Sequence, residues 1–134
     1  MKEQGASFMC QTSQISIRKL ILTHGRIRLE LDAFWQGEDL QVMLYGGEPH
    51  IGAVALASPG SGALLIVLPG HREGPLAREM AESLAQALNC KVCVTCGIHY
   101  NEINQQEIGL VLGCADEDRK STRLKSVLFW AARM

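Results

Sequence analysis

Between residues 26 and 35 the chain alternates between apolar and polar side chains with a period of two. Ile27, Leu29 and Leu31 begin an apolar series that ends at Trp35, and the positions between them are charged as far as Asp32. Successive side chains of a strand point to opposite faces of a sheet, so this pattern is typical of a half-buried antiparallel strand. Such a strand needs hydrogen-bonding partners, and the chain must therefore contain a sheet.

Four other segments before residue 70 have the composition of strands. Short links rich in turn residues separate them, among them Thr23-His24-Gly25 and the Pro59-Gly60 turn. These four segments are residues 14–22, 40–45, 51–57 and 63–68. Because consecutive strands with short links usually pair as hairpins, we predict an antiparallel meander of five strands.

The spacing of apolar residues changes to about 3.6 after residue 75. Leu76, Met80, Leu84 and Leu88 form one stripe flanked by alanines, which predicts an amphipathic helix over residues 75–88. The rest of the chain predicts a sixth strand at residues 91–98, a second helix at residues 104–114, and a charged run with a terminal helix within residues 115–134.

These elements predict an α+β fold, in which two or three helices pack on a largely antiparallel sheet of about six strands. A length of 134 residues is that of one domain. We therefore treat residues 1–134 as a single domain, and we expect residues 1–13 to be flexible.

Composition and charge argue against several classes of protein. The formal net charge is −1 and only 5% of residues are aromatic, so we expect no nucleic-acid partner. The longest apolar stretch, residues 51–69, is interrupted by Ser58-Pro59-Gly60-Ser61-Gly62, so we expect no membrane span. An odd number of cysteines, five, and no visible secretory signal favour a reducing cytoplasm.

Three of the four histidines lie in glycine-rich junctions at the ends of predicted strands. The junctions are residues 46–52 with His50, residues 69–75 with His71, and residues 96–101 with His99. Glycine allows positive φ angles and close approach of the backbone to a ligand. We therefore predict that at least two of these histidines line one site, although each taken singly is an ordinary loop residue.

The second junction leads into the start of the predicted helix, where unpaired amides and the helix dipole favour an anion. Arg72 adds a charged donor, so a phosphate group is the expected guest. The alternative is a plain helix start with a solvated arginine. Neither the P-loop nor the dinucleotide-binding glycine pattern is present, which disfavours ATP and NAD.

A metal site offers a different interpretation. His50, His71 and His99, with Glu73 or Glu48, would suit a catalytic zinc or iron ion in a small metal-dependent enzyme. The Cys90-x-x-Cys93-x-x-Cys96 run is a poorer choice, because in a strand its thiols alternate between faces.

The three junctions resemble those of a known bacterial family. The matching residues are Pro49-His50-Ile51-Gly52-Ala53-Val54-Ala55, Gly70-His71-Arg72-Glu73 and Gly97-Ile98-His99, and the likeness extends over about residues 27–112. The family is that of the prenylated-flavin chaperone-like proteins typified by the accessory protein of gallate decarboxylase, whose fold is similar to that of proteasome-assembly chaperones.

The resemblance implies a cytoplasmic, non-catalytic accessory protein that binds prenylated flavin mononucleotide (FMN), or FMN. Its implied partners are a UbiD-type aromatic acid decarboxylase and the flavin prenyltransferase, and a homodimer is expected. The implied cofactor-binding residues are Tyr45, Gly47, Pro49, His50, Gly52, Gly70, His71, Arg72, Glu73, Gly74 and His99. An assembly chaperone without a small ligand, docking through a sheet edge or residues 124–131, remains the other binding interpretation.

Overall fold

The computed structural model describes residues 16–104, 106 and 107, which form six strands and one helix. The elements are β1 (Arg18–His24), β2 (Ile27–Gln36), β3 (Asp39–Gly47), β4 (Ala53–Ala57), β5 (Leu64–Val67), α2 (Gly74–Leu88) and β6 (Val92–His99). Each lies at a position that the sequence predicts. The expected flexible segment at residues 1–13 and the terminal helix lie outside the described residues, as does most of the predicted helix at 104–114.

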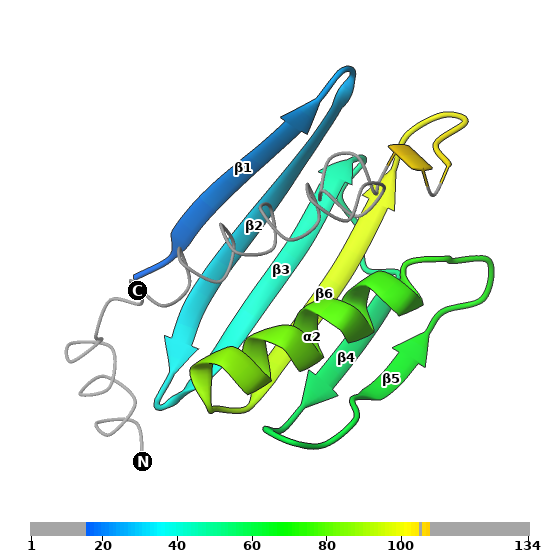
Figure 1. The fold of residues 1–134 in the computed structure, drawn as a ribbon. Helices are drawn as coiled ribbons and strands as arrows, with labels where there is room; N and C mark the ends of the chain where they lie inside the picture. Colours follow the sequence, from blue (N-terminus) through cyan, green and yellow to red (C-terminus); the bar gives the residue numbers. More distant parts are fainter. Residues whose placement is uncertain (1–15, 105, 108–134) are drawn as a thin grey trace, which may run out of the picture.

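The six strands form one sheet in the order β1-β2-β3-β6-β4-β5 (Figure 1). β1, β2 and β3 pair as antiparallel hairpins, whereas β6 lies between β3 and β4 and runs parallel to β3. The predicted five-strand meander is therefore wrong, because β4 pairs with β5 and β6 and not with β3. The expected α+β fold, with a largely antiparallel sheet and two or three helices, is corrected to a mixed sheet with one helix among the described residues.

Burial explains why β6 takes the central place. Val92, Val94 and Cys96 are fully buried, and a strand this apolar is stabilised most where neighbours flank it on both sides. α2 supplies the crossover that brings the chain back to this position. Hairpin turns are local and can be read from sequence, but the insertion of a later strand depends on long-range packing.

α2 covers one face of β4, β5 and β6 (Figure 1). Ala77, Ala81 and Ala85 are fully buried, and their small side chains let the helix lie close to the sheet. Leu84 is fully buried between them and Met80 nearly so, as the predicted stripe requires. The helix ends at Leu88 and is followed by Asn89, which has a left-handed backbone (φ 52°) and caps it.

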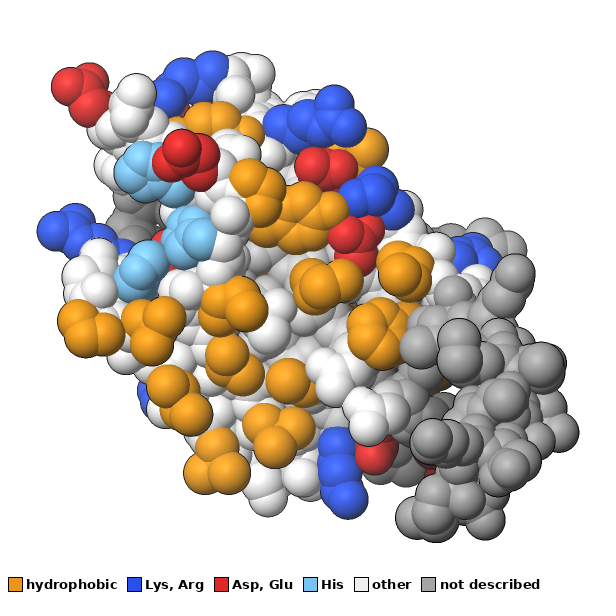
Figure 2. Space-filling view, turned by 180° about the vertical axis from the view of Figure 1, so that it is seen from behind, with side chains coloured by type: hydrophobic (Ala, Val, Ile, Leu, Met, Phe, Trp, Pro, Cys, Tyr) orange, Lys and Arg blue, Asp and Glu red, His pale blue; other side chains and the backbone are white. Residues whose placement is uncertain are grey.

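The other face of β4 and β5 carries exposed apolar side chains, visible from behind in Figure 2. Leu64 and Ile66 are 74% and 67% exposed, and they pair across the strands with Leu56 and Val54. In the described part of the chain, no helix is both long enough and apolar enough to span a bilayer.

Candidate functional site

The three glycine-rich junctions meet at one end of the central strands, where β3 and β6 finish and β4 begins. The link between β3 and β4 has to pass the end of β6, because β6 lies between these two strands. Backbone bonds hold this link: Glu48 N–H donates to His99 O (3.2 Å) and Gly52 N–H to Cys96 O (2.8 Å). The link between β5 and α2 joins it, since Leu68 N–H donates to Gly52 O (2.9 Å).

Glycines make this crossing sterically feasible. A Cβ on Gly97 would overlap the carbonyl oxygen of His50, and a Cβ on Gly47 would overlap that of His99. Gly47 also has a positive φ of 69°. A Cβ on Gly52 would overlap the carboxylate of Glu73 and lie 2.7 Å from His71 Nδ1. The clustering of glycine therefore reflects contacts of the loops with one another.

His50, His71 and Glu73 form a compact cluster where the β3–β4 and β5–α2 links meet. His50 Nε2 lies 3.5 Å from Glu73 Oε1, and His71 Nδ1 lies 3.4 Å from Glu73 Oε2. The two imidazole rings are 5.0 Å apart between centroids. The Glu73 side chain is 9% exposed, and both histidines are partly buried. The prediction that two histidines share one site corresponds to this pair.

His99 lies outside the cluster. Its Nε2 is 4.0 Å from Glu48 Oε2, and both side chains are largely exposed. Among the described residues, the group able to surround a metal ion combines His50 and His71 with Glu73. Of the metal ligands considered from sequence, His50, His71 and Glu73 therefore lie together, whereas His99 and Glu48 lie apart from them.

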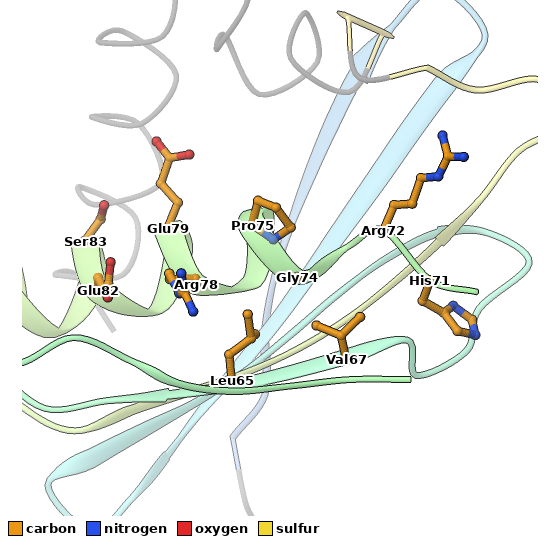
Figure 3. A pocket seen from close by; sticks show the side chains of 10 residues that line it. All are labelled: Leu65, Val67, His71, Arg72, Gly74, Pro75, Arg78, Glu79, Glu82 and Ser83. Carbon is orange, nitrogen blue, oxygen red and sulfur yellow. The ribbon is translucent and has the colours of Figure 1, made fainter. Parts of the chain in front are cut away.

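Two clefts adjoin the cluster. One, of about 420 Å³, opens on the sheet face away from α2, and the other, of about 320 Å³, lies between β5 and the first turns of α2. The first is lined by Asp32, Met43, Leu44, Tyr45, Pro49, His50, Ile51 and Thr95. The second is lined by Leu65, Val67, His71, Arg72, Gly74, Pro75, Arg78, Glu79, Glu82 and Ser83 (Figure 3). We call them the open-face cleft and the helix-side cleft.

The second junction forms the mouth of the helix-side cleft. Arg72 and His71 point in different directions at this end of the cleft, while Leu65 and Val67 rise from β5 toward α2 (Figure 3). A Cβ on Gly74 would lie 2.7 Å from Val67 Cγ2, so this glycine sets the close packing of the helix start on the sheet. Gly70 has open space around it but a positive φ of 81°, as its turn requires.

A polar network beside the open-face cleft was not expected from the sequence. The Tyr45 hydroxyl donates to Asp32 Oδ2 (2.5 Å), and Lys19 Nζ lies 2.8 Å from Asp32 Oδ1 and 3.1 Å from Glu30 Oε1. Lys19 is directly opposite Asp32 in the β1–β2 register, so a correct hairpin alignment would have revealed the pair. The network fixes the Tyr45 hydroxyl, and the tyrosine still lines the cleft.

Opposing effects set the ionisation of this network. Burial by itself raises the pKa of Asp32, but the hydrogen bonds from Lys19 and Tyr45 and the charge of Lys19 outweigh it and lower that pKa below its ordinary value. The same bonds to Asp32 and Tyr45 raise the pKa of Lys19. Asp32 therefore remains a carboxylate and Lys19 an ammonium group at neutral pH, and together they position Tyr45.

Cys90, just before β6, and Cys93 and Cys96 within it do not provide a reactive thiolate. Burial, with the charge of Glu73, raises the pKa of Cys96 to about 12. Burial also raises the pKa values of Cys90 and Cys93. All three are free thiols. Their packing in and beside the sheet accounts for the Cys-x-x-Cys spacing.

A family model matches most of this chain. The model of the family described as prenylated flavin chaperone LpdD-like domain matches residues 23–122, a range that contains both clefts and the whole His50–His71–Glu73 cluster. No curated protein matches the chain. Because the family model covers well over half of the sequence, the resemblance seen in the three junctions is confirmed, and the chain belongs to the prenylated flavin chaperone LpdD-like domain family.

Proposed function

We propose that this protein binds prenylated FMN, or FMN, and acts as an accessory protein for a UbiD-type aromatic acid decarboxylase. The observation that carries the proposal is the meeting of the three family-like junctions at one end of the central strands, between two clefts that each include a histidine of the cluster. Family membership supports the flavin-chaperone role. The decarboxylase, and the prenyltransferase that makes the flavin, are its proposed partners.

The open-face cleft is suited to the flavin ring system. Met43, Tyr45, Pro49 and Ile51 offer apolar surface, and His50 offers a polar group at its margin. The Lys19–Asp32 network holds Tyr45 in place, so little side-chain entropy is lost when a ring packs against it.

The phosphate is assigned to Arg72 and the start of α2. Among the described residues no side chain caps this helix, so the amides of its first turn have no side-chain acceptor there, and an anion could take that place. Arg72 has no ion pair with any residue that the structure describes, which leaves its guanidinium available. Gly52 and Gly74 contribute by allowing close packing here, Gly52 beside Glu73 and Gly74 against Val67.

Titration with prenylated FMN and FMN, followed by flavin absorbance and fluorescence, tests this assignment. Arg72→Ala should weaken flavin binding by about tenfold or more, because a charge-assisted hydrogen bond contributes roughly 1.5 to 3 kcal/mol. Tyr45→Ala should also weaken binding, whereas Tyr45→Phe keeps the ring and should have a smaller effect.

Arg18→Ala is the matched control, since Arg18 is an exposed arginine on β1, the strand at the opposite sheet edge from β5. It should leave flavin binding unchanged. A wild-type protein that remains colourless when produced with the flavin prenyltransferase, and that has no measurable affinity for either flavin, would contradict the proposed function.

The exposed edge of the sheet supports a protein partner as well. Within the described part of the chain β5 pairs only with β4, so one side of it presents unpaired backbone groups, and Leu64 and Ile66 add apolar surface there. We assign this edge to a second copy of the chain. A homodimer is expected because an edge strand can pair with its own copy around a twofold axis.

Replacing Leu64 with Glu tests this assignment, because two charges would face each other near the dimer axis. Light scattering coupled to size-exclusion chromatography should show a dimer for the wild type and a monomer for Leu64→Glu. Ser61→Glu, an exposed change in the turn before β5, is the control and should remain dimeric. A monomeric wild type at micromolar concentration would exclude the dimer.

The proposed compartment is the cytoplasm. Cys90, Cys93 and Cys96 are free, and a reducing environment keeps thiols in that state.

A further inference from the structure

Glu73 is a buried acid, and one of its carboxylate oxygens accepts no hydrogen bond from the described residues. Its side chain is 9% exposed, and Oε2 is inaccessible to solvent yet accepts no hydrogen bond from any described residue. Removing a carboxylate from water is costly unless positive charge or hydrogen bonds compensate it. The described residues around it offer two imidazoles and no Lys or Arg ion pair.

The distances in the cluster differ from those of ordinary hydrogen bonds. The two nitrogen–oxygen distances, 3.5 and 3.4 Å, are longer than the roughly 2.7 to 3.2 Å of a well-formed N–H···O bond. A tetrahedral metal ion with bonds of about 2.0 to 2.2 Å separates neighbouring ligand atoms by about 3.3 to 3.6 Å. One ligand atom from each of the three residues lies within 4.8 Å of the others, so small side-chain rotations complete such a set.

The orientation of His50 is fixed in the way that metal-binding histidines usually are. His50 Nδ1 lies 2.9 Å from the backbone carbonyl oxygen of Glu48, which can only accept, so Nδ1 carries the hydrogen. The other nitrogen, Nε2, then turns its lone pair toward Glu73. A backbone carbonyl on one ring nitrogen commonly orients the second nitrogen toward a metal ion.

We propose that His50 Nε2, His71 Nδ1 and the Glu73 carboxylate bind one divalent transition-metal ion of the zinc or iron(II) type. Two imidazoles and one carboxylate are a ligand set that such ions accept while keeping further positions open. The dication lies against the buried carboxylate and compensates its charge. All three proposed ligands are side chains of this protein, so the metal proposal does not depend on flavin binding.

The absence of a side chain at Gly52 leaves room for the ligands. A Cβ there would occupy the region between the Glu73 carboxylate and His71 Nδ1. The loop carrying His50 is in turn held by the backbone bonds of Glu48 and Gly52 to β6. The ligands thus come from two loops that the fold already fixes, which is the preorganisation that a metal site needs.

Metal binding is measured on the full-length chain, stripped with a chelator and then titrated with Zn²⁺, with Co²⁺ as a spectroscopic probe. The wild type should take up one Zn²⁺ per chain and show visible ligand-field absorption with Co²⁺. His50→Ala and Glu73→Gln should each weaken Zn²⁺ binding by about 100-fold or more, since changes in the outer shell alone cost about 10- to 100-fold.

His99→Ala and His24→Ala are the controls, because both remove a histidine outside the cluster. They should leave the Zn²⁺ affinity unchanged. Circular dichroism shows whether each variant folds. If His50→Ala does not fold, Glu73→Gln still tests the site, because it preserves the side-chain volume. A wild type that takes up no stoichiometric Zn²⁺ or Co²⁺, or one whose Zn²⁺ affinity falls with His99→Ala and not with Glu73→Gln, overturns the proposal.

Discussion

Gly97→Ala is expected to destabilise the protein by about 3 kcal/mol, which is large for one added methyl group. The new Cβ would overlap the carbonyl oxygen of His50, and that carbonyl belongs to backbone that cannot move alone. The loop is held to β6 by the bonds from Glu48 N–H to His99 O and from Gly52 N–H to Cys96 O. Alanine is favoured over glycine in a strand by only about 0.5 to 1 kcal/mol, so the steric cost of the overlap is larger than this gain.

Chemical denaturation at neutral pH measures this effect as a fall in the free energy of unfolding. Thermal unfolding should show a midpoint lower by roughly 10 °C. Gly62→Ala is the matched control, because Gly62 has no left-handed φ and its nearest neighbour for a Cβ, Glu82 Oε2, is at an ordinary 3.5 Å. Equal stability of Gly97→Ala and Gly62→Ala would show that the loop does not cross β6 at this point.

Gly52→Ala is expected to leave the fold nearly as stable as in the wild type but to disrupt the proposed metal site. The atoms nearest to its Cβ are the ends of two side chains, the Glu73 carboxylate and His71 Nδ1. Side-chain ends can rotate away while the backbone stays in place. We therefore expect the free energy of unfolding to change by about 1 kcal/mol, and Zn²⁺ affinity to fall by about 100-fold because two ligands are displaced together.

The measurement is Zn²⁺ titration and chemical denaturation of the same protein preparation. Gly62→Ala again serves as the control, with both properties expected to match the wild type. Unchanged Zn²⁺ affinity in folded Gly52→Ala would contradict the arrangement of Glu73 and His71 around Gly52. The pair of glycine variants thus separates the two roles of the crossing, which are backbone packing at Gly97 and ligand placement at Gly52.

The elements of this fold follow from local sequence patterns, but the order of the strands does not. Alternation at residues 27–35 and the 3.6-residue stripe in α2 reflect which side chains are buried, and burial repeats with the geometry of the element. The placement of β6 between β3 and β4 depends on contacts between residues that are far apart in sequence. The assumption that strands consecutive in the sequence pair with each other therefore fails at β3 and β4, and the predicted meander is wrong.

The residues of the site could be predicted from local sequence, but their arrangement could not. His50, His71, Arg72 and Glu73 were identified from their glycine-rich surroundings, but the sequence could not decide which of three histidines would meet. The insertion of β6 determines it, because the β3–β4 link must cross the strand end and carries His50 toward the start of α2. Lys19 and Asp32 were missed because their pairing depends on the register of β1 with β2.

The sequence by itself determined the kinds of element, the family, and the three junctions where glycine and histidine occur together. It did so because hydrophobic period, turn chemistry and motif residues are properties of short segments. Only the tertiary structure decided that Gly47, Gly52 and Gly97 let the loops cross, that Glu73 is buried beside His50 and His71, and that His99 stays outside. The physical reason is steric: close contacts between distant segments exist only after the sheet has assembled.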